Sequence, residues 1–163
     1  MRRFKKKYRK PMHPWEKQRI LEEKALMEEF AYKNKREIWK MQSFVKKYRD
    51  LAKKLVSIRT KQQEKEKKEL LAKLAKLGLV SKDATIDEVL GLTIHDVSNR
   101  RLQTLVYKKG FANTVKQARQ FITHGHVFVA GKKITSPSKL LTIEEENKIK
   151  VVGVKPDKKE VNA

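Results

Sequence analysis

The sequence has no cysteine, few acidic residues and no long apolar run. Without cysteine the chain can form neither disulfides nor Cys-ligated zinc sites. No apolar stretch approaches the roughly 20 residues that a membrane-spanning helix needs. The basic start is followed by Pro11 and Pro14 rather than by an apolar segment, so we expect no signal peptide and a cytosolic protein.

Catalytic motifs are missing as well. The chain has no phosphate-cradling glycine loop, no nucleophile elbow and no HExxH pair. We therefore expect no enzymatic activity, no catalytic residue, no cofactor, no metal site and no small-molecule substrate.

What the chain has is positive charge. Its 41 Lys and Arg against 19 Asp and Glu give a formal net charge of +22. An excess of this size cannot be buried, so it meets either a polyanion or solvent. Nucleic acid is the best-matched polyanion, because each phosphate contact releases counterions. The other interpretations are a soluble protein with a cationic surface, a DNA-compacting protein and a protein of anionic membranes.

A basic tail opens the chain. Residues 1–12 contain no acid, so we expect them to be disordered until they meet an anion. Phe4 and Tyr8 lie between the charges, where they could stack on bases. The basic side chains of this tail are Arg2, Arg3, Lys5, Lys6, Lys7, Arg9 and Lys10.

Residues 13–98 are predicted to form a helical domain. Pro14 suits the first turn of a helix over about 15–31, which includes Trp15 among its apolar residues. The clearest helix covers about 35–58, where apolar residues recur at three- and four-residue steps and lysines occupy the opposite face.

Shorter signals complete this domain. Trp39 lies beside the apolar stripe and is more often a core residue than a base-stacking platform. A mixed-charge helix is predicted to end at Gly78. Two short helices then begin with capping boxes at Thr85 and Thr93.

Residues 99–150 are predicted to form a small α+β module, followed by a C-terminal tail over 151–163 whose final PDKKEVNA is loose. Arg100 and Arg101 open a helix, and a second helix begins at Thr114, with Gln117 closing its capping box. Gly125 ends this second helix.

Alternating residues after Gly125 indicate a β-hairpin around Ala130 and Gly131. Because alanine disfavours positive φ, we expect a bulged or longer turn rather than a two-residue type I′ turn. The segment LLTIEEENKIKVVGV is predicted to supply one or two closing strands.

Arg119 is the strongest candidate for contact with RNA. A guanidinium group grips phosphate with two hydrogen bonds and also stacks on bases. The competing interpretation is an ion pair within the helix, but no acid lies three or four residues away. His124 and His126 flank Gly125 with a spacing that is poor for a metal, so contacts to phosphate or backbone and purely structural roles both stay open.

The run RRLQTLVYKKGFANTVKQARQFITHGHVFVAGKKITSPS resembles the RNA-binding module of the small-subunit ribosomal protein S4 family, often called the alpha-L motif. HPWEKQRI, KNKREIW and LGLTIHDV resemble the N-terminal helical domain of the archaeal and eukaryotic members. The resemblance covers about residues 11–140. It departs from the family pattern at Val115, where many modules carry a second arginine, and at Ala130, where asparagine is common.

The resemblance implies a mainly α-helical protein with a small α+β module, a helix-turn-helix plus β-hairpin. It implies a structural constituent of the cytoplasmic ribosome that binds folded small-subunit ribosomal RNA at a multi-helix junction and helps to nucleate assembly. Implied partners are that RNA, neighbouring small-subunit ribosomal proteins and messenger RNA where it enters the subunit. By position, the RNA-facing residues would be Arg100, Arg101, Lys109, Thr114, Lys116, Gln117, Arg119, Gln120, His124, His126, Lys132 and Lys133.

The alternative function is a free-standing RNA-binding factor in ribosome rescue or assembly, because the module alone also occurs in such factors and in RNA-modifying enzymes. DNA binding would need a helix presented to the major groove. The basic residues here are spread over helix, hairpin and tail, which favours shape recognition of folded RNA.

Overall fold

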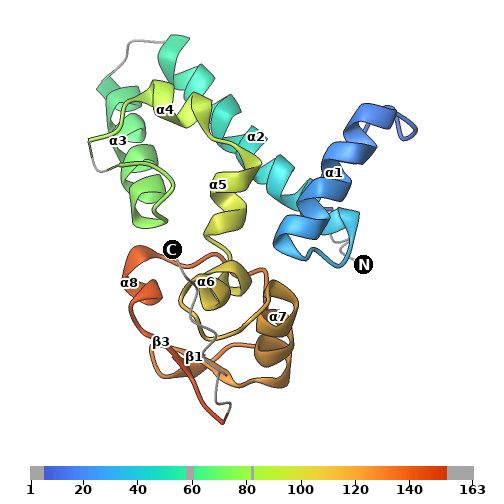
Figure 1. Ribbon diagram of the computed structural model, residues 1–163. Helices are drawn as coiled ribbons and strands as arrows, with labels where there is room; N and C mark the ends of the chain where they lie inside the picture. Colours follow the sequence, from blue (N-terminus) through green and yellow to red (C-terminus); the bar gives the residue numbers. More distant parts are fainter. Residues whose placement is uncertain (1–5, 58–60, 82, 154–163) are drawn as a thin grey trace, which may run out of the picture.

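The computed structural model describes residues 6–57, 61–81 and 83–153. Arg2, Arg3, Phe4, Lys5 and Ile58, the last residue of the helix predicted over 35–58, therefore lie outside the described residues. Five helices form the larger unit, and three helices with a small sheet form the second (Figure 1). The elements are α1 Lys17–Phe30, α2 Lys35–Ser57, α3 Lys61–Lys76, α4 Ile86–Gly91, α5 Ile94–Asn99, α6 Leu102–Lys108, α7 Val115–His124, β1 Val127–Val129, β2 Lys132–Lys133, α8 Ile143–Glu146 and β3 Ile149–Val151.

The long helix α2 is the axis of the first unit, as its periodicity predicts. Its apolar stripe is buried, and α1, α3, α4 and α5 lie along it (Figure 1). Burying one such apolar side chain stabilises the fold by about 1.5–3 kcal/mol. The buried residues of the stripe are Ile38, Met41, Val45, Tyr48 and Ala52.

The first helix begins later than predicted. The α-helix starts at Lys17, and Trp15 is 90% exposed instead of lying on an apolar face. The guanidinium of Arg19 explains the difference, because it donates hydrogen bonds to the carbonyl oxygens of His13 at 3.2 Å and Pro14 at 2.8 Å. The chain is thereby held in a turn before α1.

The short helices α4 and α5 begin at the predicted capping boxes. The Thr93 amide donates to the Asp96 carboxylate at 2.8 Å, and the Thr93 hydroxyl accepts from the Asp96 amide. Thr85 and Glu88 form the same arrangement at α4. These caps satisfy amides that have no partner within the helix.

The second unit has its own apolar core. Strand β1 lies at the centre of an antiparallel sheet in the order β2-β1-β3, and α6 and α7 share its core. Val127 and Val129 are buried, whereas Phe128 between them is half-buried. The predicted alternation of the hairpin is confirmed.

The hairpin turn is tighter than predicted. Val129 pairs with Lys132, which leaves only Ala130 and Gly131 in the loop. Both residues have positive φ, 50° and 78°, as a type I′ turn requires. The expectation of a bulged or longer turn is therefore wrong. Strand pairing on both edges of β1 offsets the roughly 1–2 kcal/mol that alanine costs in this conformation.

One closing strand, β3, follows the hairpin, and a short helix, α8, precedes that strand. The acidic run forms the single turn α8, which Thr142 caps by accepting from the Glu145 amide at 3.2 Å. Strand β3 then pairs antiparallel with β1 and ends at Val151, one residue past the predicted end of the module, so a closing strand in this segment is confirmed. None of the helices in the described ranges is long and apolar enough to span a bilayer.

Candidate nucleic-acid interface

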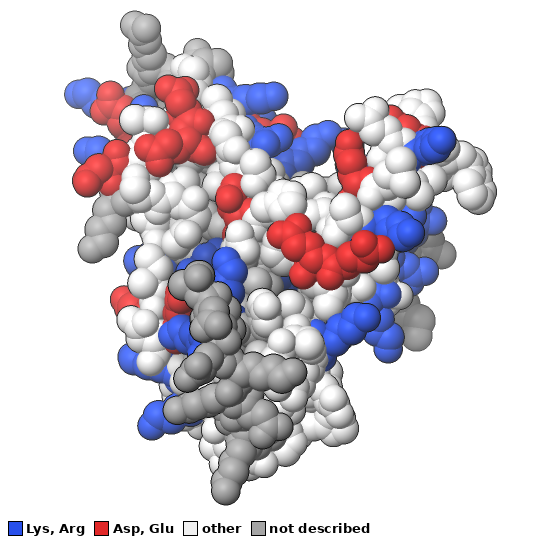
Figure 2. All heavy atoms as spheres, viewed as in Figure 1, with Lys and Arg blue, Asp and Glu red and all other residues white. Residues whose placement is uncertain are grey.

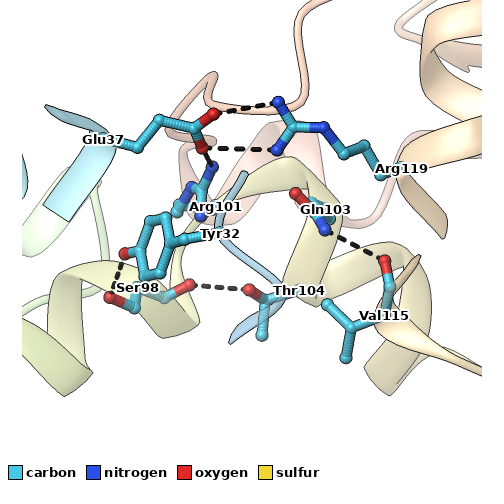
Figure 3. Close-up of polar contacts among 8 residues, drawn as sticks. All are labelled: Tyr32, Glu37, Ser98, Arg101, Gln103, Thr104, Val115 and Arg119. Carbon is cyan, nitrogen blue, oxygen red and sulfur yellow. Dashed lines mark hydrogen bonds and ion pairs between the residues drawn. The ribbon is translucent and has the colours of Figure 1, made fainter. Parts of the chain in front are cut away.

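One carboxylate joins the two units. Glu37, in the first turn of α2, accepts hydrogen bonds from Arg101 at 2.8 Å and from Arg119 at 2.9 and 3.3 Å (Figure 3). Arg101 is the residue before α6, and Arg119 lies in α7. Paired contacts between guanidinium and carboxylate fix geometry as well as charge, so this junction orients the second unit against α2.

Arg101 is a structural residue. Its side chain is 0% exposed, and its Cζ lies 4.2 Å from the centroid of the Tyr32 ring. Tyr32 in turn hydrogen-bonds Ser98 at 2.5 Å (Figure 3). A buried guanidinium must be paired, and Glu37 supplies the charge. The expectation that Arg101 faces RNA is corrected, since a side chain without exposed surface has none to offer.

Arg119 is partly withdrawn from the surface. Its side chain is 23% exposed and both terminal nitrogens donate to Glu37. The acid lies 82 positions away in the sequence, so a search for partners within the helix could not find it. Glu37 is the functional residue that sequence reasoning missed. Its only signal was its position within the KNKREIW motif.

The electrostatics of Glu37 reflect this pairing. Burial raises the pKa of its carboxyl, but the hydrogen bonds and charges of Arg119 and Arg101 outweigh burial. The pKa of Glu37 therefore lies below its ordinary value of 4.5. The carboxylate stays charged, and with it the link between the units.

Arg100 and Lys109 are turned toward α8. The guanidinium of Arg100 forms an ion pair with Glu146 at 2.7 Å, and Lys109 donates to the Glu146 backbone carbonyl. The prediction that Arg100 opens a helix together with Arg101 is wrong for Arg100. This residue follows the end of α5, and Arg101 alone precedes α6. The charge of Arg100 is neutralised inside the protein, whereas the Lys109 side chain remains exposed.

The predicted cap of α7 is present. The Thr114 hydroxyl accepts from the Gln117 amide at 3.1 Å, and the Gln117 side chain accepts from the Asn113 amide at 2.7 Å. Both polar side chains are thus engaged by their own helix. His126 lies 3.2 Å from the Val152 carbonyl, and its ring is 6.5 Å from that of His124.

The remaining predicted residues of the module lie at its surface. They come from α7 and β2, and all five side chains can donate a hydrogen bond to phosphate. These exposed residues are Lys116, Gln120, His124, Lys132 and Lys133.

A second basic surface combines the tail with α2. The Arg9 amide donates to Ser43 at 3.0 Å, and the Tyr8 ring lies 6.0 Å from the Trp39 ring. Residues 6–12 have no regular secondary structure, but they lie against α2, which differs from the expected disordered tail. The cations brought together around one shallow hollow are Lys6, Lys7, Arg9, Lys46, Lys47 and Lys54.

Acidic side chains gather elsewhere. In the view of Figure 2 they form a band over α1 and a group over the part of the molecule that contains α3 and α4. Glu28 and Glu29 of α1 and Asp87 and Glu88 of α4 are exposed acids of these elements. Acidic side chains are therefore unevenly distributed on this face, where lysines and arginines lie beside them (Figure 2).

Metal ligands are not assembled in the part of the chain that the structure describes: no group of three His, Asp or Glu side chains there could hold an ion. His124 and His126 are therefore not part of such a group in the described residues.

Comparison with known proteins covers nearly the whole chain. Residues 2–99 match the family described as the ribosomal protein S4/S9 N-terminal domain, and residues 100–147 match the S4 domain. These two matches meet at Arg100, between α5 and α6.

Three archaeal relatives carry the same name, small ribosomal subunit protein uS4. The protein of Ignicoccus hospitalis is 44% identical over 95% of this chain and 93% of its own length. The protein of Nanoarchaeum equitans is 47% identical over 96% of this chain and 88% of its own length. The protein of Saccharolobus solfataricus is 46% identical over 91% of this chain and 82% of its own length. With both family matches and this coverage, the chain belongs to the S4 family of small-subunit ribosomal proteins.

Proposed function

We propose that the chain is a structural constituent of the small subunit of cytoplasmic ribosomes, where it binds folded ribosomal RNA. Its archaeal relatives are named as proteins of that subunit. The single observation that carries the RNA assignment is the exposed positive charge, because lysines of the module, the tail and α2 face outward while Arg101 and Arg119 are paired with Glu37. Such lysines contact phosphates and bind without reading bases.

The proposed RNA-binding residues follow from exposure. Arg101 is removed from the set, Arg100 is neutralised, and Thr114 and Gln117 act chiefly as caps. Arg119 keeps a partly exposed edge, through which it can meet a phosphate while Glu37 orients it. The set that remains comprises Lys6, Lys7, Arg9, Lys10, Lys109, Lys116, Arg119, Gln120, His124, His126, Lys132 and Lys133.

The finer parts of the proposal concern where the protein lies. We place it at a multi-helix junction of the RNA, beside other ribosomal proteins and near messenger RNA entering the subunit, with a role in nucleating assembly. A rigid junction between two units supports this placement, since it presents two basic surfaces at a set spacing, as shape recognition requires. We propose no catalytic role.

The free-standing factor is not favoured. It would share the S4 domain but not the N-terminal domain, and that domain matches over residues 2–99 here. The relatives at 44–47% identity are named as subunit proteins rather than as rescue factors.

Sedimentation tests the assignment. Small subunits are washed at high salt, and the protein is expected to stay with them in a one-to-one ratio because many phosphate contacts act together. Complete release under that wash would favour the factor. In a second measurement, junction-containing archaeal small-subunit RNA competes with duplex DNA, and equal affinity for the two would overturn the proposed recognition of RNA.

A further inference from the structure

A hollow lies where the tail passes the turn between α1 and α2. Its volume is about 690 Å³, within the roughly 300–1,000 Å³ of sites that hold small organic ligands. Trp39, Pro11 and Pro14 supply its apolar lining. The cationic side chains that line it are Lys10, Lys35 and Arg36.

A buried acid builds this hollow. Glu23 of α1 is 1% exposed and accepts a hydrogen bond from the Trp39 indole nitrogen at 2.9 Å. Arg19 donates to the same carboxylate and also to the Pro14 carbonyl, at 2.8 Å for the latter. One carboxylate therefore fixes the orientation of the indole and holds the proline turn beside it. A hollow shaped by buried polar contacts is a preformed one.

The positive charge at the hollow is only partly neutralised. Lys35 lies 3.3 Å from Glu23, which it shares with Arg19. Lys10 and Arg36 form no ion pair within residues 6–57, 61–81 and 83–153, and both side chains are exposed. Two cations beside an aromatic wall suit a ligand that is both anionic and flat.

We propose that this hollow binds one unstacked nucleotide of the RNA, with its base against Trp39 and its phosphate on Lys10 and Arg36. The inference rests on the proposed RNA binding and adds a site that selects an extruded base. Unstacked bases are commonly held on aromatic side chains, with cations tracking the backbone. An acidic peptide would satisfy the two cations but would offer no ring to stack on the indole, whose aromatic neighbour Tyr8 is tilted by 37° against it.

The test uses the full chain with Trp15→Phe, which leaves Trp39 as the single tryptophan of a chain that has two. Archaeal small-subunit ribosomal RNA is titrated while filter retention measures binding and fluorescence measures Trp39. The emission of Trp39 is expected to fall in step with RNA binding. Ultraviolet irradiation is expected to join RNA to the peptide that contains Trp39.

Two substitutions isolate the ring. Trp39→Leu and Trp39→Phe both lose the hydrogen bond to Glu23, so the difference between them reports the aromatic face alone. We expect Trp39→Leu to bind RNA about 5-fold more weakly than Trp39→Phe, the lower end of a base-stacking contribution. Arg36→Ala is expected to weaken binding, whereas Lys33→Ala, at an exposed lysine that does not line the hollow, leaves it unchanged.

The outcomes separate this site from the proposed function. RNA bound at full affinity with unchanged Trp39 emission, or with equal affinities of the Leu and Phe variants, overturns the nucleotide site and leaves RNA binding in place. Failure to retain RNA at all overturns both. Quenching of Trp39 by poly-glutamate as strong as by RNA would overturn the nucleotide in favour of an acidic peptide.

Discussion

The junction at Glu37 and the surface formed by the tail and α2 are both rich in cations, but they use them differently. At the junction, Arg101 and Arg119 share one carboxylate and little of their charge reaches solvent. Along α2, Lys46 and Lys47 are exposed; Asp50 lines the same hollow, but neither lysine forms an ion pair with an acid in the part of the chain that the structure describes. The same formal charge therefore holds two units together in one region and remains available to phosphate in the other.

The difference follows from side-chain chemistry. A guanidinium is planar, weakly hydrated and able to form paired hydrogen bonds, so it tolerates burial against a carboxylate and an aromatic ring. An ammonium group is strongly hydrated and stays at the surface on its flexible stem. In this protein arginine assembles the RNA-binding shape and lysine supplies most of the exposed charge.

The largest effect is expected from breaking the junction. Arg101→Met removes the buried cation and leaves part of the Glu37 carboxylate without its partner. We expect the free energy of unfolding to fall by about 3 kcal/mol or more, as for other buried ion pairs broken on one side. Urea unfolding followed by circular dichroism measures this loss.

The matched control is Arg36→Ala, one residue from Glu37 but exposed, where a change within about 0.5 kcal/mol is expected. A loss below about 1 kcal/mol for Arg101→Met would mean that the junction contributes little, and that the two regions differ less than their geometry indicates.

Acid should remove the contribution of the Glu37 carboxylate to stability. The pKa of Glu37 in the folded protein lies below its ordinary 4.5, so the carboxylate binds protons more readily when the chain is unfolded. Its contribution to stability is complete above pH 4.5 and is lost as the pH falls through the lower, folded value. Glu37→Gln is expected to cost about 1–3 kcal/mol near neutral pH, and the difference from the parent should shrink in acid.

The comparison variant is Glu64→Gln, at an exposed acid of α3. Its difference from the parent should be small at every pH. A Glu37→Gln difference that stays constant from neutral pH into acid would contradict the ionic link.

The surface formed by the tail and α2 is tested by the salt dependence of RNA affinity. Lys47→Ala removes one exposed cation of the tail surface and should lower the slope of log affinity against log salt by about 1 if it contacts a phosphate. Stability should change by less than about 0.5 kcal/mol. Filter binding to archaeal small-subunit RNA across a salt series measures the slope.

Lys24→Ala is the control variant for Lys47→Ala, because Lys24 is an exposed lysine of α1, where the acidic band lies. An equal change of slope for both variants would mean that RNA contacts are spread over the whole molecule, and that the uneven distribution of charge does not define the binding surface.

The smallest effect concerns the hairpin that presents Lys132 and Lys133. Ala130 has a φ of 50°, which asparagine tolerates better than alanine. Ala130→Asn is expected to raise the free energy of unfolding by about 0.5–1 kcal/mol and to leave RNA affinity unchanged. Thermal unfolding measures the gain, and a loss of stability would show that the turn does not have this type I′ geometry.

Much of the local structure was predictable because its causes are local. The stripe of α2 follows from the spacing of apolar residues, and the starts of α5 and α7 follow from the caps at Thr93 and Thr114. The alternation of Val127 and Val129 likewise follows from strand periodicity. The hairpin turn was predicted wrongly because β3, which pairs with β1, comes from further along the chain. Trp15 was misplaced because a side chain of α1, Arg19, binds the backbone before the helix, a contact that apolar periodicity does not register.

The candidate site was predictable as chemistry but not as a set of side chains. Composition and motif indicate a basic, RNA-binding module, and both family matches agree. They could not tell that Arg101 is buried or that Arg100 meets Glu146, since each partner lies far along the chain. The hollow at Trp39 was equally hidden, because it needs the tail and α2 together.

Sequence alone determined the net charge, the order of helices and the family, because composition, periodicity and motif are properties of neighbouring residues. Tertiary structure decided which cations are neutralised and which face outward. The physical reason is distance: Glu37 and Arg119 are 82 positions apart, and only the folded chain brings their charges within 3 Å.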